Sequence, residues 1–295
     1  MTEAKPLSGF LNILKPPGMS SHDIVGYVRR VLHTKKVGHA GTLDPAAAGV
    51  LPVAVGTATR LIEYLELTDK TYRAEIKLGI ATDSGDDTGR ILTSQADWSD
   101  FDRSAIEAVL EKFTGKIRQT PPAHSAIKIN GQRACDLLRA GKKVEVPSRE
   151  VTIYRLDLLA HGHDMLLIDT DCSKGTYIRS LCQDIGEALG VPATMAFLLR
   201  RRVGDFSVEN ALTLEELAAK GAEALLPADE YLSNMQRFDL NPKREKAFGN
   251  GLSSTVRNFT AQTENLRVYA DGHFIGIGRY DKDREEILPV KVMGR

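Results

Sequence analysis

The sequence has little cysteine and no long apolar run. Its 295 residues include three cysteines, an odd number, and none of them forms a CxxC pair. This pattern argues against a disulfide framework and a zinc site, and it favours reduced thiols in the cytoplasm. No apolar stretch approaches the roughly 20 residues needed to span a bilayer, and the first ten residues lack the layout of a signal peptide. We therefore expect a cytoplasmic protein without a membrane anchor.

The chain also lacks an excess of charge of either sign. Lysine plus arginine and aspartate plus glutamate both number 39, so net charge gives no evidence for a nucleic-acid partner. If the protein binds RNA, its basic residues must be gathered on one face. The sequence shows neither an internal repeat nor a low-complexity segment, and its length suffices for a main domain with a small appended one.

What the sequence does contain is a distinctive loop over residues 38–52. It holds three glycines, two prolines, one imidazole (His39) and one carboxylate (Asp44), and it lies between an expected amphipathic helix and an apolar run. Glycine admits close approaches and backbone conformations closed to other residues, and the proline after Asp44 keeps the Asp44 backbone extended. Local composition leaves two interpretations open with about equal weight. One is a rigid turn that presents an acid to a bulky ligand, and the other is an ordinary connection whose aspartate caps a helix.

Periodicity predicts strands and amphipathic helices along the rest of the chain. The clearest strand is 70–79, where apolar residues from Tyr72 to Leu78 alternate with charged ones, so by periodicity alone Tyr72 belongs to the core. Residues 81–89 are expected to form an acidic hairpin connection, because they lack the oxygen spacing and closing glutamate of a calcium loop. Other strands are expected over 10–15, 144–159 and 165–172, and helices over 57–67 and 104–113, after Ser20 or Ser21, and from a Thr176 cap to Leu189.

The loop sequence GHAGTLDPAAAGVLPV closely resembles the catalytic-loop motif of the TruB family of tRNA pseudouridine synthases. Further segments are similar to motifs of this family and spread the resemblance over most of the chain. They are LNILKPPGMSS near the start, KTYRAEIKLG from residue 70, the run from Gln119 to Arg133, SKGTYIRS from residue 173 and LLRRRVGDF from residue 198.

This resemblance implies roles in catalysis for three residues. Asp44 matches the catalytic aspartate, which would act as nucleophile or base. Arg179 lies in the first turn of an expected helix, where a cation opposes the helix dipole and invites an anionic partner. It would pair with Asp44 and keep that carboxylate ionised and oriented. Tyr72 would stack on the target base, a role compatible with packing at the edge of the core.

Other residues are expected to line the pocket or to contact RNA. His39 would fill the space left by a flipped nucleotide or contact that nucleotide, the alternative being a structural hydrogen bond within the loop. Lys15 is expected to be structural or phosphate-contacting rather than catalytic. The remaining residues are two pocket-lining side chains (Tyr177 and Leu199, the latter as a wall), a phosphate-facing arginine cluster (Arg200, Arg201 and Arg202) and two basic residues of a thumb insertion (Lys128 and Arg133).

The expected fold is α+β, a pseudouridine-synthase sheet that is mixed but largely antiparallel and flanked by helices. A catalytic domain over 1–237 would carry the thumb at about 119–150. The composition changes near Phe238, and short strands separated by turns follow. Residues 238–295 therefore resemble the small β-barrel RNA-binding domain called PUA.

The resemblance implies isomerisation of uridine to pseudouridine in the T-arm loop of tRNA, at position 55. This reaction gains and loses no atoms, so we expect neither a metal nor a cofactor. A glycosidase would need two carboxylates in one site, and a metal nuclease several acids or histidines. We expect a stand-alone monomer acting on the T-arm stem-loop. The alternatives are an RNA-binding protein or tRNA-folding chaperone, and a guide-RNA-dependent pseudouridine synthase.

Overall fold

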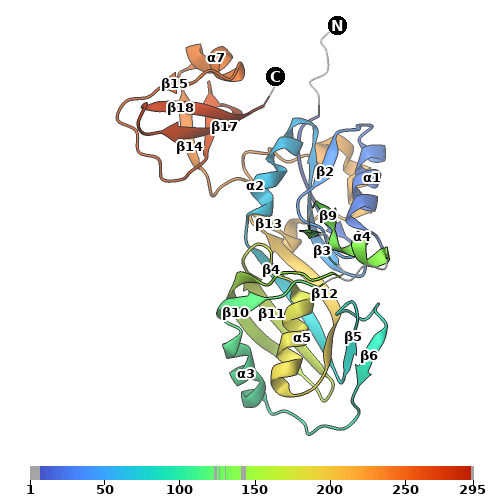
Figure 1. Cartoon of the computed structure of the whole chain (residues 1–295). Helices are drawn as coiled ribbons and strands as arrows, with labels where there is room; N and C mark the ends of the chain where they lie inside the picture. The colour runs from blue at the N-terminus through green and yellow to red at the C-terminus, as the bar shows by residue number, and fades with distance from the viewer. Residues whose placement is uncertain (1–6, 123–124, 126, 130, 141–143, 294–295) are drawn as a thin grey trace.

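The computed structural model describes residues 7–122, 125, 127–129, 131–140 and 144–293. Within these ranges, the side chains of five thumb residues lie outside the description: Lys128, Ile129, Arg133, Cys135 and Arg139. Figure 1 shows two bodies, each built on a β-sheet. The larger body contains the N-terminal and middle parts of the chain, and the smaller body contains its C-terminal part.

A nine-stranded sheet organises the larger body, in the order β1-β3-β12-β4-β11-β10-β7, with β2 paired to β3 and β13 to β12. In the described chain every pair in it is antiparallel except β3 with β12. The expected α+β class with a largely antiparallel sheet is thus confirmed. The strands are β1 (Gly9–Lys15), β2 (Val37–His39), β3 (Ala48–Val55), β4 (Lys70–Leu78), β7 (Gly115–Gln119), β10 (Arg149–His161), β11 (Met165–Cys172), β12 (Ala193–Val203) and β13 (Phe206–Ser207).

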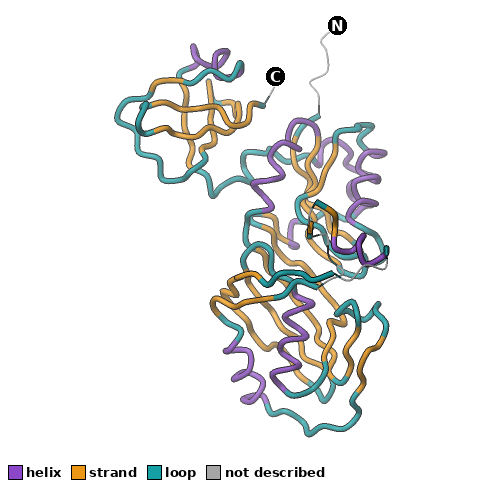
Figure 2. Tube along the Cα trace, in the orientation of Figure 1, coloured by secondary structure: helices purple, strands orange, loops and turns teal. Residues whose placement is uncertain are grey.

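Helices flank this sheet, as Figure 2 shows in purple. Helix α5 packs on β12 and β4, α3 packs on β10, and α1 packs on β2. The helices are α1 (Ser21–Val31), α2 (Ile62–Glu66), α3 (Arg103–Lys112), α4 (Ala134–Arg139), α5 (Ile178–Leu189), α6 (Leu214–Lys220) and α7 (Glu245–Gly249), with 3-10 turns η1 (Gly56–Leu61), η2 (Val208–Asn210), η3 (Gly221–Ala224) and η4 (Pro242–Arg244).

Local sequence signals explain several of these elements. Ser20 and Asp23 form a reciprocal capping box that starts α1, and Thr213 and Glu216 form one that starts α6. The alternation of β4 buries Ala74 and Ile76 completely, because this strand lies between β11 and β12 with its apolar face under α5.

Two predicted elements differ from the structure. Residues 57–67 do not form one helix, because the chain from Gly56 makes a 3-10 turn before α2 begins at Ile62. The strand predicted from residue 144 begins only at Arg149, where β7 provides the first pairing partner. Residues 81–89 connect β5 (Ile80–Thr82) to β6 (Ile91–Ser94), which confirms the hairpin connection.

The segment between Gln119 and Arg149 leaves the sheet at the end of β7 and returns at the start of β10. Its described part contains a short hairpin, β8 (Lys128–Ile129) with β9 (Gln132–Arg133), followed by α4. This segment is thus inserted between two paired strands of the sheet, where the sequence analysis expected the thumb.

The smaller body is a five-stranded sheet in the order β14-β16-β17-β18-β15 with its own apolar core around Phe248 and Val268. Its strands are β14 (Gln236–Leu240), β15 (Ser254–Thr255), β16 (Leu266–Ala270), β17 (His273–Asp281) and β18 (Glu286–Val292). Because Gln236 already pairs with Leu266, this sheet begins two residues before the composition change near Phe238.

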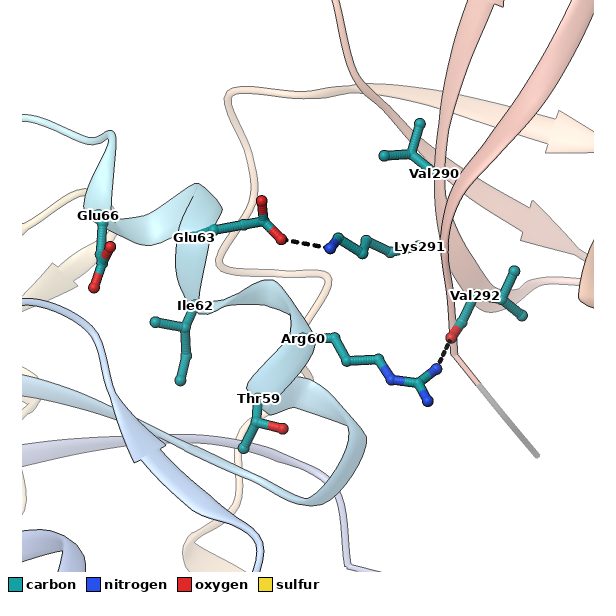
Figure 3. A pocket seen from close by; sticks show the side chains of 8 residues that line it. All are labelled: Thr59, Arg60, Ile62, Glu63, Glu66, Val290, Lys291 and Val292. Atoms are coloured by element: carbon teal, nitrogen blue, oxygen red, sulfur yellow. Dashed lines mark hydrogen bonds and ion pairs between the residues drawn. The ribbon is translucent and has the colours of Figure 1, made fainter. Parts of the chain in front are cut away.

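The two bodies meet at a cavity of about 520 Å³ between the η1–α2 segment and β18 (Figure 3). Arg60 donates a hydrogen bond to the Val292 carbonyl at 2.7 Å, and the Lys291 ammonium lies 2.7 Å from the Glu63 carboxylate. The apolar side of the contact includes Ile277, which is fully buried in one cluster with residues of the larger body. Polar and apolar contacts together dock the C-terminal sheet.

The parallel contact between β3 and β12 depends on a glycine. Gly49 has a φ of +117°, and a Cβ there would lie 2.2 Å from the Arg200 carbonyl oxygen. We predict that Gly49→Ala lowers the free energy of unfolding by about 3 kcal/mol or more, because backbone strain and a backbone clash add. Urea denaturation measures this loss.

Gly115→Ala is the matched control, since Gly115 has a φ of +95° but nothing within 4 Å of its Cβ position. It should lose only the strain, about 1–2 kcal/mol. Equal losses in the two variants would show that the close approach of β3 to β12 is not limiting.

Candidate active site

The loop that follows β2 carries Asp44 in a tight, well-tethered turn. The Ala47 amide donates to the Asp44 carbonyl at 3.1 Å. The Ser21 hydroxyl, at the start of α1, accepts from the Leu43 amide at 2.9 Å and donates to the Leu43 carbonyl at 3.1 Å. In the described structure no helix begins at Asp44, so its carboxylate is not a helix cap. The loop instead places the Asp44 carboxylate just before the N-terminal end of β3.

Arg200 supports this loop from inside the protein. Its side chain is almost completely buried, and its guanidinium donates to the carbonyls of Val50, Gly41 and Thr42 at 2.8, 3.0 and 3.3 Å. Burial lowers the pKa of Arg200 from its ordinary value. Because the guanidinium contacts backbone at both ends of the loop, it fixes the distance between them. The expected phosphate contact of Arg200 is therefore wrong.

Lys15 also supports this loop, at its Pro45 end. It is fully buried, and its ammonium donates to the carbonyls of Met19, Pro16 and Pro45 at 2.7, 2.9 and 3.2 Å. Burial, together with the charge of Arg200, lowers the pKa of Lys15 to about 8. Of the two roles expected for Lys15, the structure supports the structural one, because a phosphate cannot reach the buried ammonium.

Asp44 and Arg179 meet as predicted. The Arg179 Nε lies 3.2 Å from the Asp44 Oδ2, with 39% of the Asp44 side chain exposed and only 6% of the Arg179 side chain. Burial raises the pKa of Asp44 above its ordinary value, and the neighbouring charge of Arg179 opposes that rise. The pair thus presents a carboxylate toward solvent with a guanidinium held behind it.

Asp86 is a member of this site that the sequence analysis missed. Its Oδ2 lies 3.7 Å from the Arg179 Nη1, which also donates to the Ser84 carbonyl at 2.9 Å. Burial would raise the pKa of Asp86, but hydrogen bonds from Thr88 and Ser84 and the charge of Arg179 together lower it. The acidic loop 81–89 therefore connects two strands of a hairpin and also provides Asp86 as a second carboxylate for Arg179.

The helix that carries Arg179 begins differently from the prediction. Its N-cap is Tyr177 rather than Thr176, and the Tyr177 side chain makes no capping hydrogen bond. Arg179 is the second residue of α5 and still lies in its first turn, where the positive end of the helix dipole disfavours a cation. The carboxylates of Asp44 and Asp86 and the Ser84 carbonyl offset this unfavourable interaction with the helix dipole.

Tyr72 lies beneath the loop in an apolar cluster that includes Leu43, Ala47 and Ile178. It is 7% exposed, and burial raises the pKa of its hydroxyl to about 12, while the charge of Arg200 opposes the rise. Tyr72 therefore stays protonated over the physiological pH range. Its packing agrees with the core position that periodicity predicted, whereas stacking on a base stays a prediction.

The structure corrects the position expected for Leu199, because Leu198 and not Leu199 lies on the face of β12 that Tyr72 shares. In the antiparallel pairing of β12 with β4, Leu198 lies opposite Ala74 and Leu199 opposite Arg73. Side chains of directly opposed residues share a face, so Leu199 points away from Tyr72, whereas Leu198 joins the Tyr72 cluster. A register irregularity between Met195 and Phe197 changes the alternation along β12.

Comparison with known proteins identifies the family. Residues 29–178 match the TruB family pseudouridylate synthase (N terminal domain), and residues 179–235 match the tRNA pseudouridylate synthase B C-terminal domain. The chain is 44% identical over 296 aligned residues to tRNA pseudouridine synthase B of Heliobacterium mobile, covering 98% of this chain and 95% of that protein. It is 41% identical to that of Clostridioides difficile (strain 630), covering 95% and 97%. The chain belongs to the TruB family.

A solved structure of a Cbf5-Nop10-Gar1 complex has a similar fold. Its matching chain superposes with a TM-score of 0.73 at 25% identity, covering 97% of this chain and 84% of that one. The similarity supports the arrangement of the sheets and helices in the TruB-family chain.

His39 precedes the loop that carries Asp44, and Tyr177 precedes the helix α5 that carries Arg179. His39 is at the end of β2, and its Nδ1 is buried without a hydrogen-bond partner among the described residues. Burial, with the charges of Arg200 and His22, lowers the pKa of His39. The Tyr177 ring lies under the Arg149 guanidinium, 5.0 Å from the centroid. The structure thus gives neither a partner to the His39 Nδ1 nor a hydrogen bond to the Tyr177 hydroxyl within the described chain.

The other two arginines of the expected cluster lie on the opposite face of the sheet. Arg201 contacts the Asp169 carboxylate at 2.8 Å, and Arg202 donates to the Thr71 hydroxyl at 3.0 Å. Asp169 also binds Arg73. The three arginines therefore do not form one cluster, because Arg200 is buried on the other face, whereas phosphate contacts of the partly exposed Arg201 and Arg202 stay a prediction.

The last expected RNA contacts are Lys128 and Arg133, whose side chains lie outside the described residues.

Over the described chain, no three His, Cys, Asp or Glu side chains come together in a way that could hold a metal. Within the same ranges, none of the helices has the length and apolar character required to cross a membrane.

The electrostatics of the site predict opposite effects of two substitutions on the Asp44 pKa. Arg179→Gln removes the cation that stabilises the carboxylate, so the pKa of Asp44 should rise further above its ordinary value. Asp86→Asn removes a repelling charge, so the pKa should fall. Titration of the carboxyl 13C resonance measures both changes.

Arg90→Gln is the control for these titrations, because Arg90 is exposed and pairs with Asp83 outside the site. It should leave the Asp44 titration unchanged. If Arg179→Gln lowered the Asp44 pKa or left it in place, the electrostatic role of Arg179 would be refuted.

Proposed function

We propose that this protein isomerises uridine to pseudouridine in the T-arm loop of tRNA, at position 55, as a stand-alone enzyme with Asp44 as its catalytic residue. Its membership of the TruB family makes it a tRNA pseudouridine synthase. The observation that carries the assignment of the site is the pair of Asp44 and Arg179, with the carboxylate partly exposed and the guanidinium buried behind it.

The chemistry needs one well-placed oxygen. The bond between N1 and C1′ breaks, the uracil turns, and a bond between C5 and C1′ forms. The product is an isomer of the substrate, so the reaction requires no redox partner and no group donor. In this proposal the Asp44 carboxylate acts as nucleophile or base, and Arg179 orients it. The floor formed by Tyr72 and the wall formed by Leu198 would hold the cleaved base in place.

The target base must first leave its stack. An enzyme that acts on a base inside a folded RNA has to extrude it into the pocket. His39 lies five residues before Asp44 on the same loop and is partly exposed, so it would contact the flipped nucleotide or fill the space that the nucleotide leaves. Tyr177 would line the same pocket from the start of α5.

We infer a division of labour between two domains. The catalytic domain would include the thumb at about 119–150, whose Lys128 and Arg133 would contact the RNA hairpin. The sheet that starts at Gln236 would be a PUA-like RNA-binding domain and would extend the contact beyond the T-arm. We propose that the enzyme acts as a monomer in the cytoplasm, without a metal or cofactor.

The role of Asp44 predicts a loss of chemistry without a loss of binding. Asp44→Asn should reduce pseudouridine formation in an unmodified T-arm stem-loop by at least about 10³-fold, because the amide is neither a nucleophile nor a base. RNA affinity should change by less than about threefold, since the substitution keeps the shape of the side chain. The assay contains EDTA and maps pseudouridine by a specific chemical adduct.

The matched control is Asp87→Asn, which removes the same charge from an exposed position in the neighbouring acidic loop. It should retain full activity. Near-normal turnover by Asp44→Asn would exclude Asp44 as the catalytic residue. Tight binding without conversion by the wild-type protein would favour an RNA chaperone or a guide-RNA-dependent enzyme.

The proposed C-terminal domain predicts a separable effect on binding. A chain that ends at Met235 should bind whole tRNA about 10-fold more weakly or worse, because it loses one of two RNA-binding surfaces. The single-turnover rate at saturating RNA should stay within about threefold, since every residue assigned to the pocket lies before Met235. Filter binding and rapid quench separate the two quantities.

The matched control replaces Lys291 by Gln, which removes the ion pair with Glu63 but keeps the domain. Exposed pairs of this kind contribute about 0–1 kcal/mol, so tRNA binding should change little. Complete loss of turnover by the shortened chain at saturating RNA, with its fold intact by circular dichroism, would refute the division of labour.

A further inference from the structure

Gln119, the last residue of β7, binds the N-cap residue of the helix that carries Arg179. Its side chain is 1% exposed. The Gln119 Oε1 accepts from the Tyr177 amide at 2.7 Å, and the Gln119 Nε2 donates to the Tyr177 carbonyl at 2.9 Å. One carboxamide therefore satisfies both backbone groups of the N-cap residue across 58 positions of sequence.

This contact supplies, from a distant strand, the half of a capping box that accepts from the amide of the N-cap residue. The Tyr177 side chain forms no capping hydrogen bond, and the Tyr177 carbonyl is also the first acceptor of the helix, since it accepts from the Leu181 amide at 3.1 Å. Polar groups at a helix end that are left without partners destabilise its first turn. The first turn of α5 is the one that contains Arg179, so its geometry depends on a partner from another strand.

A second tether lies beside the first. The Ser180 hydroxyl donates to the Thr120 carbonyl at 2.8 Å. On the return strand, the Arg149 guanidinium donates to the Gly175 carbonyl and covers the Tyr177 ring. Residues at both ends of the segment 119–149 thus hold the stretch from Gly175 to Ser180, and of these contacts only the Gln119 carboxamide binds the N-cap backbone twice.

We propose that Gln119 is a positioning residue of the reaction, which aims Arg179 at Asp44 by clamping the N-cap of α5. The proposal rests on the proposed function and adds to it a residue that touches neither substrate nor the reacting groups. Gln119 acts on Arg179 through two hydrogen bonds to the backbone. A displacement of about 1 Å in a site of this kind reduces a rate by about 10²-fold.

The test compares Gln119→Met, which keeps the length of the side chain and removes both hydrogen bonds, with Tyr27→Phe. Tyr27→Phe removes one hydrogen bond from a side chain to a backbone carbonyl, that of Leu214, on the far side of α1. Single-turnover rates at saturating stem-loop RNA are measured across pH, and RNA affinity is measured in the Asp44→Asn background.

We expect Gln119→Met to lower the rate about 10- to 100-fold with RNA affinity unchanged within threefold, and Tyr27→Phe to change neither. The acid limb of the rate should move to higher pH, because a displaced Arg179 lowers the Asp44 pKa less. In the Arg179→Ala background, Gln119→Met should add less than threefold, since its effect passes through Arg179. A loss confined to RNA affinity, an unmoved acid limb or additive losses would each overturn the proposal.

A measurement without turnover keeps this proposal apart from the proposed function. The Arg179 Nε–H resonance, assigned by its loss in Arg179→Lys, reports the contact with Asp44 in the free protein. It should shift in Gln119→Met and not in Tyr27→Phe, whether or not the wild-type protein converts uridine. An unchanged resonance would refute the role of Gln119 even in an active enzyme.

Discussion

The loop that carries Asp44 depends on one buried cation. The Arg200 guanidinium replaces its water shell with the carbonyls of Gly41, Thr42 and Val50, which lie before and after Asp44. Transfer of an unpaired charge into a protein interior is costly, so the fold tolerates Arg200 only while these carbonyls surround it. Arg200 in turn constrains the loop. The loop backbone must adopt a conformation in which three of its carbonyls accept hydrogen bonds from one planar guanidinium. Lys15 adds a second constraint at Pro45. Asp44 is held by backbone that two cations bind from below.

Features encoded by neighbouring residues could be predicted from the sequence. The alternation of β4, the capping boxes at Ser20 and Thr213, and the glycine- and proline-rich loop all follow from local backbone and side-chain preferences. The pairing of Asp44 with Arg179 came from the family resemblance supported by one physical argument, that a cation in a first helical turn calls for an anion. Those parts of the site agree with the structure.

The mistaken predictions concern properties that only tertiary structure determines. The motif match assigned Leu199 without knowledge of how β12 pairs with β4, and that pairing places Leu198 rather than Leu199 on the side of Tyr72. Three consecutive arginines suggest a surface for phosphate, yet Arg200 is buried because β3 runs beside it. Asp86 and Gln119 were missed for a related reason: a turn residue and a strand-end residue reach their partners across about 60 to 100 positions, and that distance leaves no periodic pattern.

The local charge of the site differs from the charge of the chain. The whole sequence is neutral, with 39 residues of each sign, but the groups around the loop include four cations (Arg179, Arg200, Lys15 and Lys70) and the carboxylates of Asp44 and Asp86. The cations outnumber these two carboxylates, and all four are buried whereas the Asp44 carboxylate is partly exposed. A low-dielectric surrounding extends the field of such charges toward the opening of the site. Among the described residues, the cations that hold the Asp44 loop also offset the charge of its carboxylates, which weakens the repulsion that these carboxylates would exert on the phosphates of an RNA.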